Sequence, residues 1–176
     1  MSTRTLSRVV VAAVAILLIA APAAADRGDD EDRPIKMAWS GTFVILEEGP
    51  ECSAEGFVPV YFEGTGNVSH MGAVEVEAHH CANLVTGEVT LGVQVITAAN
   101  EDELFGTYVG QLTPVTETEW TCVTYNTYEG GTGRFTNASG FAGPTDTWVT
   151  FTSPTAGVLG GETFGTISYD ASDRSN

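Results

Sequence analysis

The stretch that decides the fold of this chain reads Gly130-Gly131-Thr132-Gly133-Arg134-Phe135-Thr136-Asn137-Ala138-Ser139-Gly140. Glycine readily adopts the positive φ angles that sharp reversals of the backbone need. Phe135 and Ala138 are three positions apart, which is about one helical turn, so both side chains can fill the same gap. We therefore expect a strand, a tight glycine turn, one short helical turn and a second strand, with the turn built by Gly130, Gly131, Gly133, Phe135, Ala138 and Gly140.

The chain on both sides of this stretch has the pattern of β-strands. Residues 88–95 alternate polar and apolar side chains, so Val89, Leu91, Val93 and Val95 share one face. The same kind of pattern predicts further strands at 42–46, 57–62, 74–78, 104–112, 118–128, 147–152 and 164–169. So many short strands predict an all-β fold, either an eight-stranded antiparallel β-barrel or a β-sandwich. The glycine stretch favours the barrel, because tight closure needs glycine at the bends.

The glycine stretch resembles the GGTG-x-F…A-x-G signature of dirigent proteins and of the wider group of allene oxide cyclase-like barrels. Two further segments, 66–72 and 96–100, are similar in kind and order to segments of small secreted bacterial proteins. The resemblance spans roughly residues 60 to 140 and implies a closed, calycin-like barrel. No polar lumen residue of those families matches a position in this sequence, so the resemblance carries no catalytic role over.

The first residues have the features of a signal peptide. Arg4 and Arg8 precede an apolar run at 9–21, and Ala23-Ala24-Ala25 offers a cleavage site. The run is shorter than the roughly 20 residues that a membrane-spanning helix needs. We predict cleavage near Ala25 and a secreted protein, extracellular or periplasmic, with no membrane span. The expected organisation is a signal peptide at 1–25, an acidic disordered tail at 26–36, one barrel domain at 37–170 and a C-terminal tail at 171–176.

The chain is strongly acidic, with a formal net charge of −16. Removal of the signal peptide would take away two arginines and no acidic residue, which makes the balance more negative still. Such a surface repels nucleic acid, so we expect no nucleic-acid partner.

Three cysteines, Cys52, Cys81 and Cys122, predict one disulfide and one remaining thiol in an oxidising compartment. A hairpin centred between Gly66 and Asn67 would pair positions whose numbers sum to 133, and Cys52 and Cys81 meet that sum. We favour a Cys52–Cys81 disulfide, with Cys81–Cys122 as the open alternative.

The three histidines, His70, His79 and His80, lie near Cys81 in the sequence and raise the question of a metal site. Neighbours on a strand point to opposite faces, so His79 and His80 are poorly placed to share one ion. We expect no metal and no cofactor.

A barrel of eight strands is just wide enough to hold one small ligand. Glu75 and Glu77 would line the lumen if Val74 and Val76 packed outward. With these two carboxylates, the candidate ligand-binding residues are three aromatic ones, Tyr108, Trp120 and Trp148. The leading hypothesis is a barrel that binds a small apolar or aromatic molecule without catalysis. The alternatives are a cyclase or isomerase with polar lumen residues, and a structural or adhesive envelope protein. The sequence indicates neither the oligomeric state nor the catalytic residues.

Overall fold

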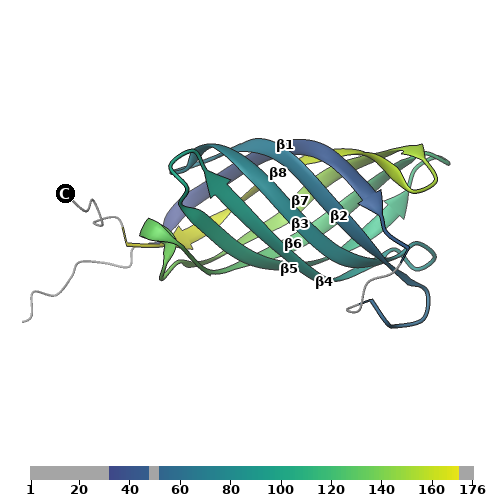
Figure 1. Ribbon diagram of the computed structural model, residues 1–176, viewed down its shortest axis with the longest axis horizontal. Helices are drawn as coiled ribbons and strands as arrows, with labels where there is room; N and C mark the ends of the chain where they lie inside the picture. Colours follow the sequence, from purple (N-terminus) through teal and green to yellow (C-terminus); the bar gives the residue numbers. More distant parts are fainter. Residues whose placement is uncertain (1–31, 48–51, 171–176) are drawn as a thin grey trace, which may run out of the picture.

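The computed structural model describes residues 32–47 and 52–170, and its strands form a closed barrel (Figure 1). The predicted signal peptide at 1–25 and C-terminal tail at 171–176 lie outside the described residues, as does most of the predicted acidic tail. A short 3₁₀ turn, η1 (Gly133–Phe135), separates the last two strands from the others. The strands are β1 (Arg33–Ile45), β2 (Phe57–Val68), β3 (Gly72–Asn83), β4 (Glu88–Ala98), β5 (Glu103–Pro114), β6 (Glu119–Gly131), β7 (Ser139–Ser153) and β8 (Ala156–Ser168).

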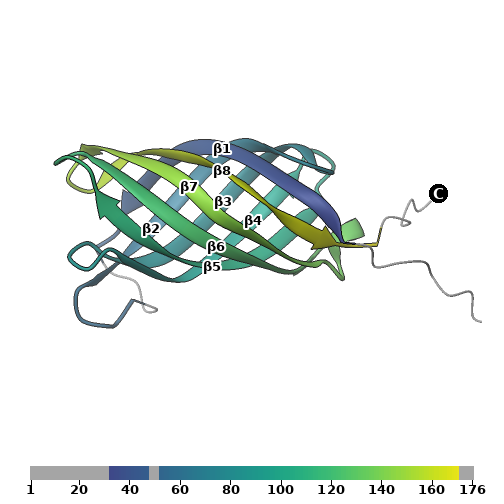
Figure 2. The same cartoon turned by 180° about the vertical axis from the view of Figure 1, so that it is seen from behind.

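Each strand pairs antiparallel with the next one along the chain, and β8 returns to pair with β1 (Figure 2). The closing pair runs from Arg33 opposite Ile167 to Val44 opposite Ala156. Among the described strands none has a free edge, because closure pairs the first with the last. The predicted eight-stranded antiparallel β-barrel is confirmed, and the sandwich alternative is wrong.

All eight strands are longer than the sequence pattern predicted, and three of them begin well before their predicted first residue. β1 begins at Arg33, ahead of the predicted strand start at 42, and its Ile35 and Met37 are buried inside the barrel. Residues 33–36, predicted to belong to the disordered tail, are therefore part of this strand. β7 and β8 begin well before positions 147 and 164. The sequence pattern did not predict the first half of β8, because this part contains Gly157, Gly161 and other glycines. Glycine has no side chain, so the alternation of polar and apolar residues is not visible there.

The glycine stretch has the predicted course. Gly130 and Gly133 adopt positive φ angles of 96° and 53°, and η1 follows before β7 begins. Phe135 is only 1% exposed, and the Ala138 amide donates to the Phe135 carbonyl oxygen at 2.9 Å. A side chain at Gly131 would strike the carbonyl oxygen of Glu103 on β5, so the turn lies directly against that strand.

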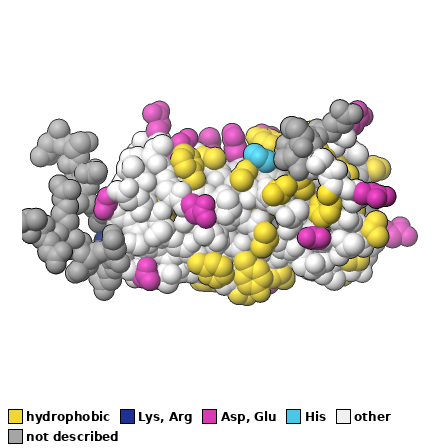
Figure 3. All heavy atoms as spheres, turned by 90° about the horizontal axis from the view of Figure 1, so that it is seen from below, with side chains coloured by type: hydrophobic (Ala, Val, Ile, Leu, Met, Phe, Trp, Pro, Cys, Tyr) yellow, Lys and Arg dark blue, Asp and Glu magenta, His cyan; other side chains and the backbone are white. Residues whose placement is uncertain are grey.

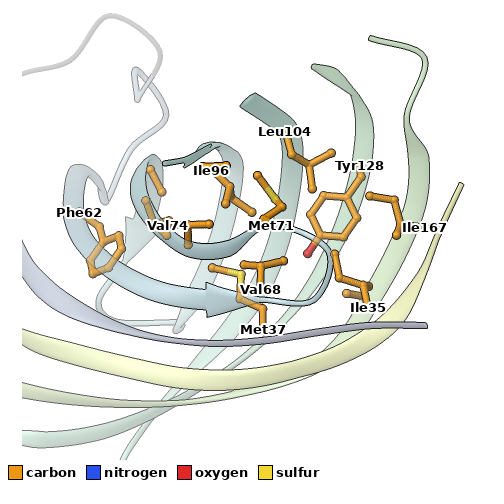
Figure 4. Packing of buried hydrophobic residues seen from close by; sticks show 14 of the residues in the cluster. Ile35, Met37, Phe62, Val68, Met71, Val74, Ile96, Leu104, Tyr128 and Ile167 are labelled. Atoms are coloured by element: carbon orange, nitrogen blue, oxygen red, sulfur yellow. The ribbon is translucent and has the colours of Figure 1, made fainter. Parts of the chain in front are cut away.

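Apolar side chains fill the end of the barrel that carries η1 (Figure 4). The turn between β2 and β3 brings Met71 inward, where it lies near Leu104 and Tyr128. Residues from η1 and from strands far apart in the sequence complete this plug: Ile35, Val68, Val74, Ile96, Phe135 and Ile167. This end of the lumen is therefore closed by core packing.

The disulfide joins Cys52 to Cys81, with 5.4 Å between their Cα atoms, and Cys122 is a free, buried thiol. The pairing is confirmed, but the register from which we inferred it is wrong. In the β2–β3 hairpin Cys81 lies opposite Pro59, and the turn is centred on His70 rather than between Gly66 and Asn67. Gly66 therefore lies inside β2 and not in the turn. Glycine fits there because β1 passes so close that a Cβ atom would lie 2.6 Å from the Ala38 carbonyl oxygen.

Apolar side chains also gather on part of the outer surface (Figure 3). The exposed ones on β4, β5 and β6 include Leu91, Phe105, Val109 and Tyr125. Within the described residues there is no helix that is both long enough and apolar enough to cross a membrane.

Candidate functional site

The lumen contains a cavity of about 100 Å³ above the apolar plug. A single water molecule needs about 10–15 Å³ of such space, so a molecule of about seven to ten heavy atoms has room there. The wall formed by β1 to β4 is largely apolar, and its lining residues include Met37, Trp39, Phe43, Ile45, Val60, Phe62, Val76, Ala78, Ala82 and Val89. Period-two alternation of the strands brings these side chains to one surface.

The wall formed by β5 to β8 is different because it carries neutral polar groups. These are Tyr108, Cys122, Thr124, Asn126, Tyr128, Thr145, Thr147 and Thr163, with Gln94 contributed by β4. Asn126 organises part of this wall: its Nδ2 donates to Thr145 Oγ1 at 2.8 Å, and its Oδ1 accepts from Gln94 Nε2 at 3.1 Å. The cavity thus has an apolar side and a hydrogen-bonding side.

His80 on β3 faces the polar wall. Its Nδ1 lies 2.8 Å from the Tyr108 hydroxyl, and the two rings meet edge to face. A bulge between His79 and Cys81 changes the pairing of β3 with β4 next to His80. The sequence does not predict the contact between His80 and Tyr108, because the two residues lie on strands that are not adjacent in the barrel.

Burial sets the protonation states in the lumen. It lowers the pKa of His80 to about 4, with a smaller contribution from the charge of His79, so His80 is neutral at pH 7. Burial raises the pKa of the Tyr108 hydroxyl, and it raises the pKa of the Cys122 thiol to about 12. A histidine with so low a pKa is a weak base, and a thiol with so high a pKa is a weak nucleophile. At pH 7 His80 and Cys122 are therefore both uncharged.

Neutral His80 makes the stability of the barrel depend on pH. An unfolded chain protonates this histidine near its ordinary pKa of 6.5, whereas the folded protein does so only near 4. The stability contributed by neutral His80 is thus complete above pH 6.5 and is lost as the pH falls to about 4. The loss amounts to about 3 kcal/mol, since one pKa unit corresponds to about 1.4 kcal/mol.

His80→Gln tests this dependence, because the glutamine amide does not titrate and can form a hydrogen bond with the Tyr108 hydroxyl. Urea unfolding between pH 7 and pH 4 should show that wild type loses more stability than the variant. The exposed His79→Gln is the control and should lose nearly as much stability as wild type, because His79 makes only the smaller contribution to the pKa of His80. Parallel pH profiles for wild type and His80→Gln would contradict the assignment.

Of the five predicted ligand-binding residues, two lie inside the barrel and three lie on its outer face. Tyr108 lines the cavity, and Trp120 packs against Phe151, with 5.9 Å between the ring centroids. Glu75, Glu77 and Trp148 lie on the outer face, and Trp148 is 50% exposed. Contrary to expectation, none of these three side chains faces the lumen, because their neighbours in each strand take the inward positions: Val74, Val76 and Ala78 on β3, and Thr147 and Val149 on β7.

The histidines do not form a metal centre in the structure. His70 Nε2 lies 3.0 Å from the Pro34 carbonyl oxygen, His79 points outward and His80 points inward. Cys81 is held in the disulfide. Within residues 32–47 and 52–170, no three His, Cys, Asp or Glu side chains gather closely enough to hold a metal ion.

No family model, curated protein or solved structure matches this chain. The barrel that the dirigent-like resemblance implied is present. No family assignment follows from these comparisons, so the function is argued from the lumen itself.

Most residues of the polar wall were not among the predicted site residues. The inward positions of β6 hold Cys122, Thr124 and Asn126, and those of β7 hold Thr145 and Thr147. Alternation was visible in both strands, but threonine and asparagine are ordinary residues on the outside of a barrel. Only the closed register shows that they face inward.

Proposed function

We propose that this protein is a carrier or receptor that binds a small apolar or aromatic molecule inside the barrel. The observation that carries the proposal is the cavity of about 100 Å³ between an aromatic, aliphatic wall and a neutral polar wall. Ligand sites of soluble proteins typically combine a mostly apolar lining with a few placed polar groups. Burial of an aromatic ring among Trp39, Phe43 and Phe62 would supply the affinity, at about 25 cal/mol per Å² of apolar surface.

The two other hypotheses have less support. An enzyme of the cyclase or isomerase type needs an acid or base of suitable pKa, and His80 is a weak base. The lining residues, all within the described chain, include no Asp or Glu. A purely structural role would need no space in the lumen, whereas the plug fills only one end of this one.

Filling the cavity tests the proposal. Ala78 on β3 lines the cavity, and Ala73 on the same strand is exposed on the outer face. We expect the wild-type protein to bind α-methylstyrene, as measured by isothermal titration calorimetry, and Ala78→Leu to weaken binding at least about tenfold by occupying the space.

Ala73→Leu is the matched control, because it adds the same side chain to the same strand outside the lumen, and it should bind like wild type. Native mass spectrometry of the purified protein is an independent test, because a small molecule retained in the barrel would add its mass to that of the protein. Absence of binding in wild type, or equal binding by Ala78→Leu, would refute a ligand site in the barrel.

A further inference from the structure

Three hydroxyl groups on the cavity wall have no hydrogen-bond partner within the described chain: Thr147 Oγ1, Thr163 Oγ1 and Tyr128 Oη. Thr147 is 7% exposed and Thr163 is 2% exposed, so bulk water does not solvate them. A buried hydroxyl without a partner costs about 1–3 kcal/mol. Native proteins leave few such groups, and each one calls for an explanation.

The neighbouring polar side chains show that the lumen does not lack partners in general. Asn126 bonds to Gln94, Thr145 and the Ala142 carbonyl oxygen. His80 and Tyr108 bond to each other. The two threonine hydroxyls remain free although satisfied networks lie on the same wall.

Thr147 and Thr163 lie close together on adjacent strands. Thr147 of β7 is paired with Gly161 of β8, and Thr163 is the next inward position on β8. A side chain on Gly161 would begin 3.0 Å from Thr147 Oγ1. Glycine at this position therefore leaves the Thr147 hydroxyl uncovered, with Thr163 beside it.

The charge of the lumen narrows the class of ligand. None of the lining residues, all within the described chain, is Asp, Glu, Lys or Arg. His80 is neutral at pH 7 because burial lowers its pKa to about 4. An ionised ligand would be buried here without a counter-charge, which is strongly unfavourable.

We infer that the cavity selects an uncharged molecule with an apolar body and one hydrogen-bond acceptor, such as an aromatic ketone, whose oxygen accepts from Thr147 and Thr163. This inference rests on the proposed function and adds the chemical class and the polar contact. The apolar body lies against the side chains of β1 to β4, and the acceptor oxygen satisfies the two hydroxyls. Tyr128, which lies deeper toward the plug, is not needed for this contact.

The test compares three probes of one shape. Acetophenone has a carbonyl group where α-methylstyrene has a C=CH₂ group, and benzoate carries a charge at the same place. The variant Thr147→Val/Thr163→Val removes both hydroxyls and keeps the side-chain shape. Because the hydroxyls have no partners in the free protein, we expect the variant to remain folded, with a melting temperature no lower than that of wild type.

We expect the ratio of acetophenone affinity to α-methylstyrene affinity to fall about tenfold from wild type to the double variant. The affinity for α-methylstyrene should not fall, and benzoate should not bind. Thr166→Val, on the outer face of β8, is the control and should keep the wild-type ratio.

The outcomes separate this inference from the proposed function. Binding of α-methylstyrene with an unchanged ratio in the double variant would overturn the contact with the threonines and leave the carrier standing. Benzoate binding as tight as acetophenone binding would overturn the neutral class. Absence of binding by both neutral probes would overturn the carrier and the inference together.

Discussion

Replacing Phe135 with alanine should lower the free energy of unfolding by about 4 kcal/mol, the usual cost of emptying a fully buried phenylalanine site. Phe135 is 1% exposed, and its ring centroid lies 5.0 Å from that of Tyr169. The cavity left behind would be hard to refill, because η1 is fixed on both sides by glycines pressed against neighbouring strands. Urea unfolding followed by circular dichroism measures the loss.

Phe141→Ala is the matched control, since Phe141 is 47% exposed on the outer face of β7. Its loss should stay below about 1 kcal/mol, as for surface substitutions in general. Equal losses in the two variants would show that the glycine stretch does not close this end of the barrel.

Removing the disulfide should cost about 3.5 kcal/mol. The bridge joins residues separated by 29 positions, and chain-entropy estimates for a loop of that length give this value. Cys52→Ala/Cys81→Ala should therefore unfold at a clearly lower urea concentration than wild type. A reductant should shift wild type toward the variant by a similar amount.

Two controls isolate the bridge. Reductant should leave the double variant unchanged, and Cys122→Ala should keep its response to reductant, because Cys122 takes no part in the bond. A wild-type protein whose unfolding is insensitive to reductant would contradict the prediction.

The fold class was predictable because its signals are local. The turn at 130–140 needs glycine at Gly130 and Gly133 for their positive φ angles, and it needs Phe135 and Ala138 to fill one gap. Strand alternation at 88–95 and elsewhere depends only on neighbours in the sequence. Eight such strands with short turns left few ways to bury their inner faces.

The register of the strands was harder to predict than the fold class, because it depends on contacts between residues that are distant in the sequence. The Gly64-Thr65-Gly66 segment has the composition of a turn, yet it lies inside β2 where β1 passes close to it. A shift of the hairpin centre to His70 changes every partner along β2 and β3. The disulfide prediction succeeded because Cys52 reaches Cys81 from the connection ahead of β2, which hairpin arithmetic did not consider.

The candidate site was the hardest part of the structure to predict from the sequence. Its polar groups are common residues, and their significance comes from the lumen that closure creates around them. Thr147 and Thr163 have no sequence signal that distinguishes them from the many threonines on the outer face. Glu75 and Glu77 were predicted to bind a ligand as a pair of carboxylates, but Val74 and Val76 occupy the inward positions of β3.

Closure of β1 onto β8 also sets the order in which the molecule can be completed. Every other pairing joins consecutive strands and can form as each new strand leaves the ribosome. The last pairing joins the two ends of the barrel sequence, and such distant contacts form slowly. Until β8 is available, the apolar inner face of β1 remains open to other chains. Nascent or truncated forms that lack β8 should therefore depend on chaperones and should aggregate when these are scarce.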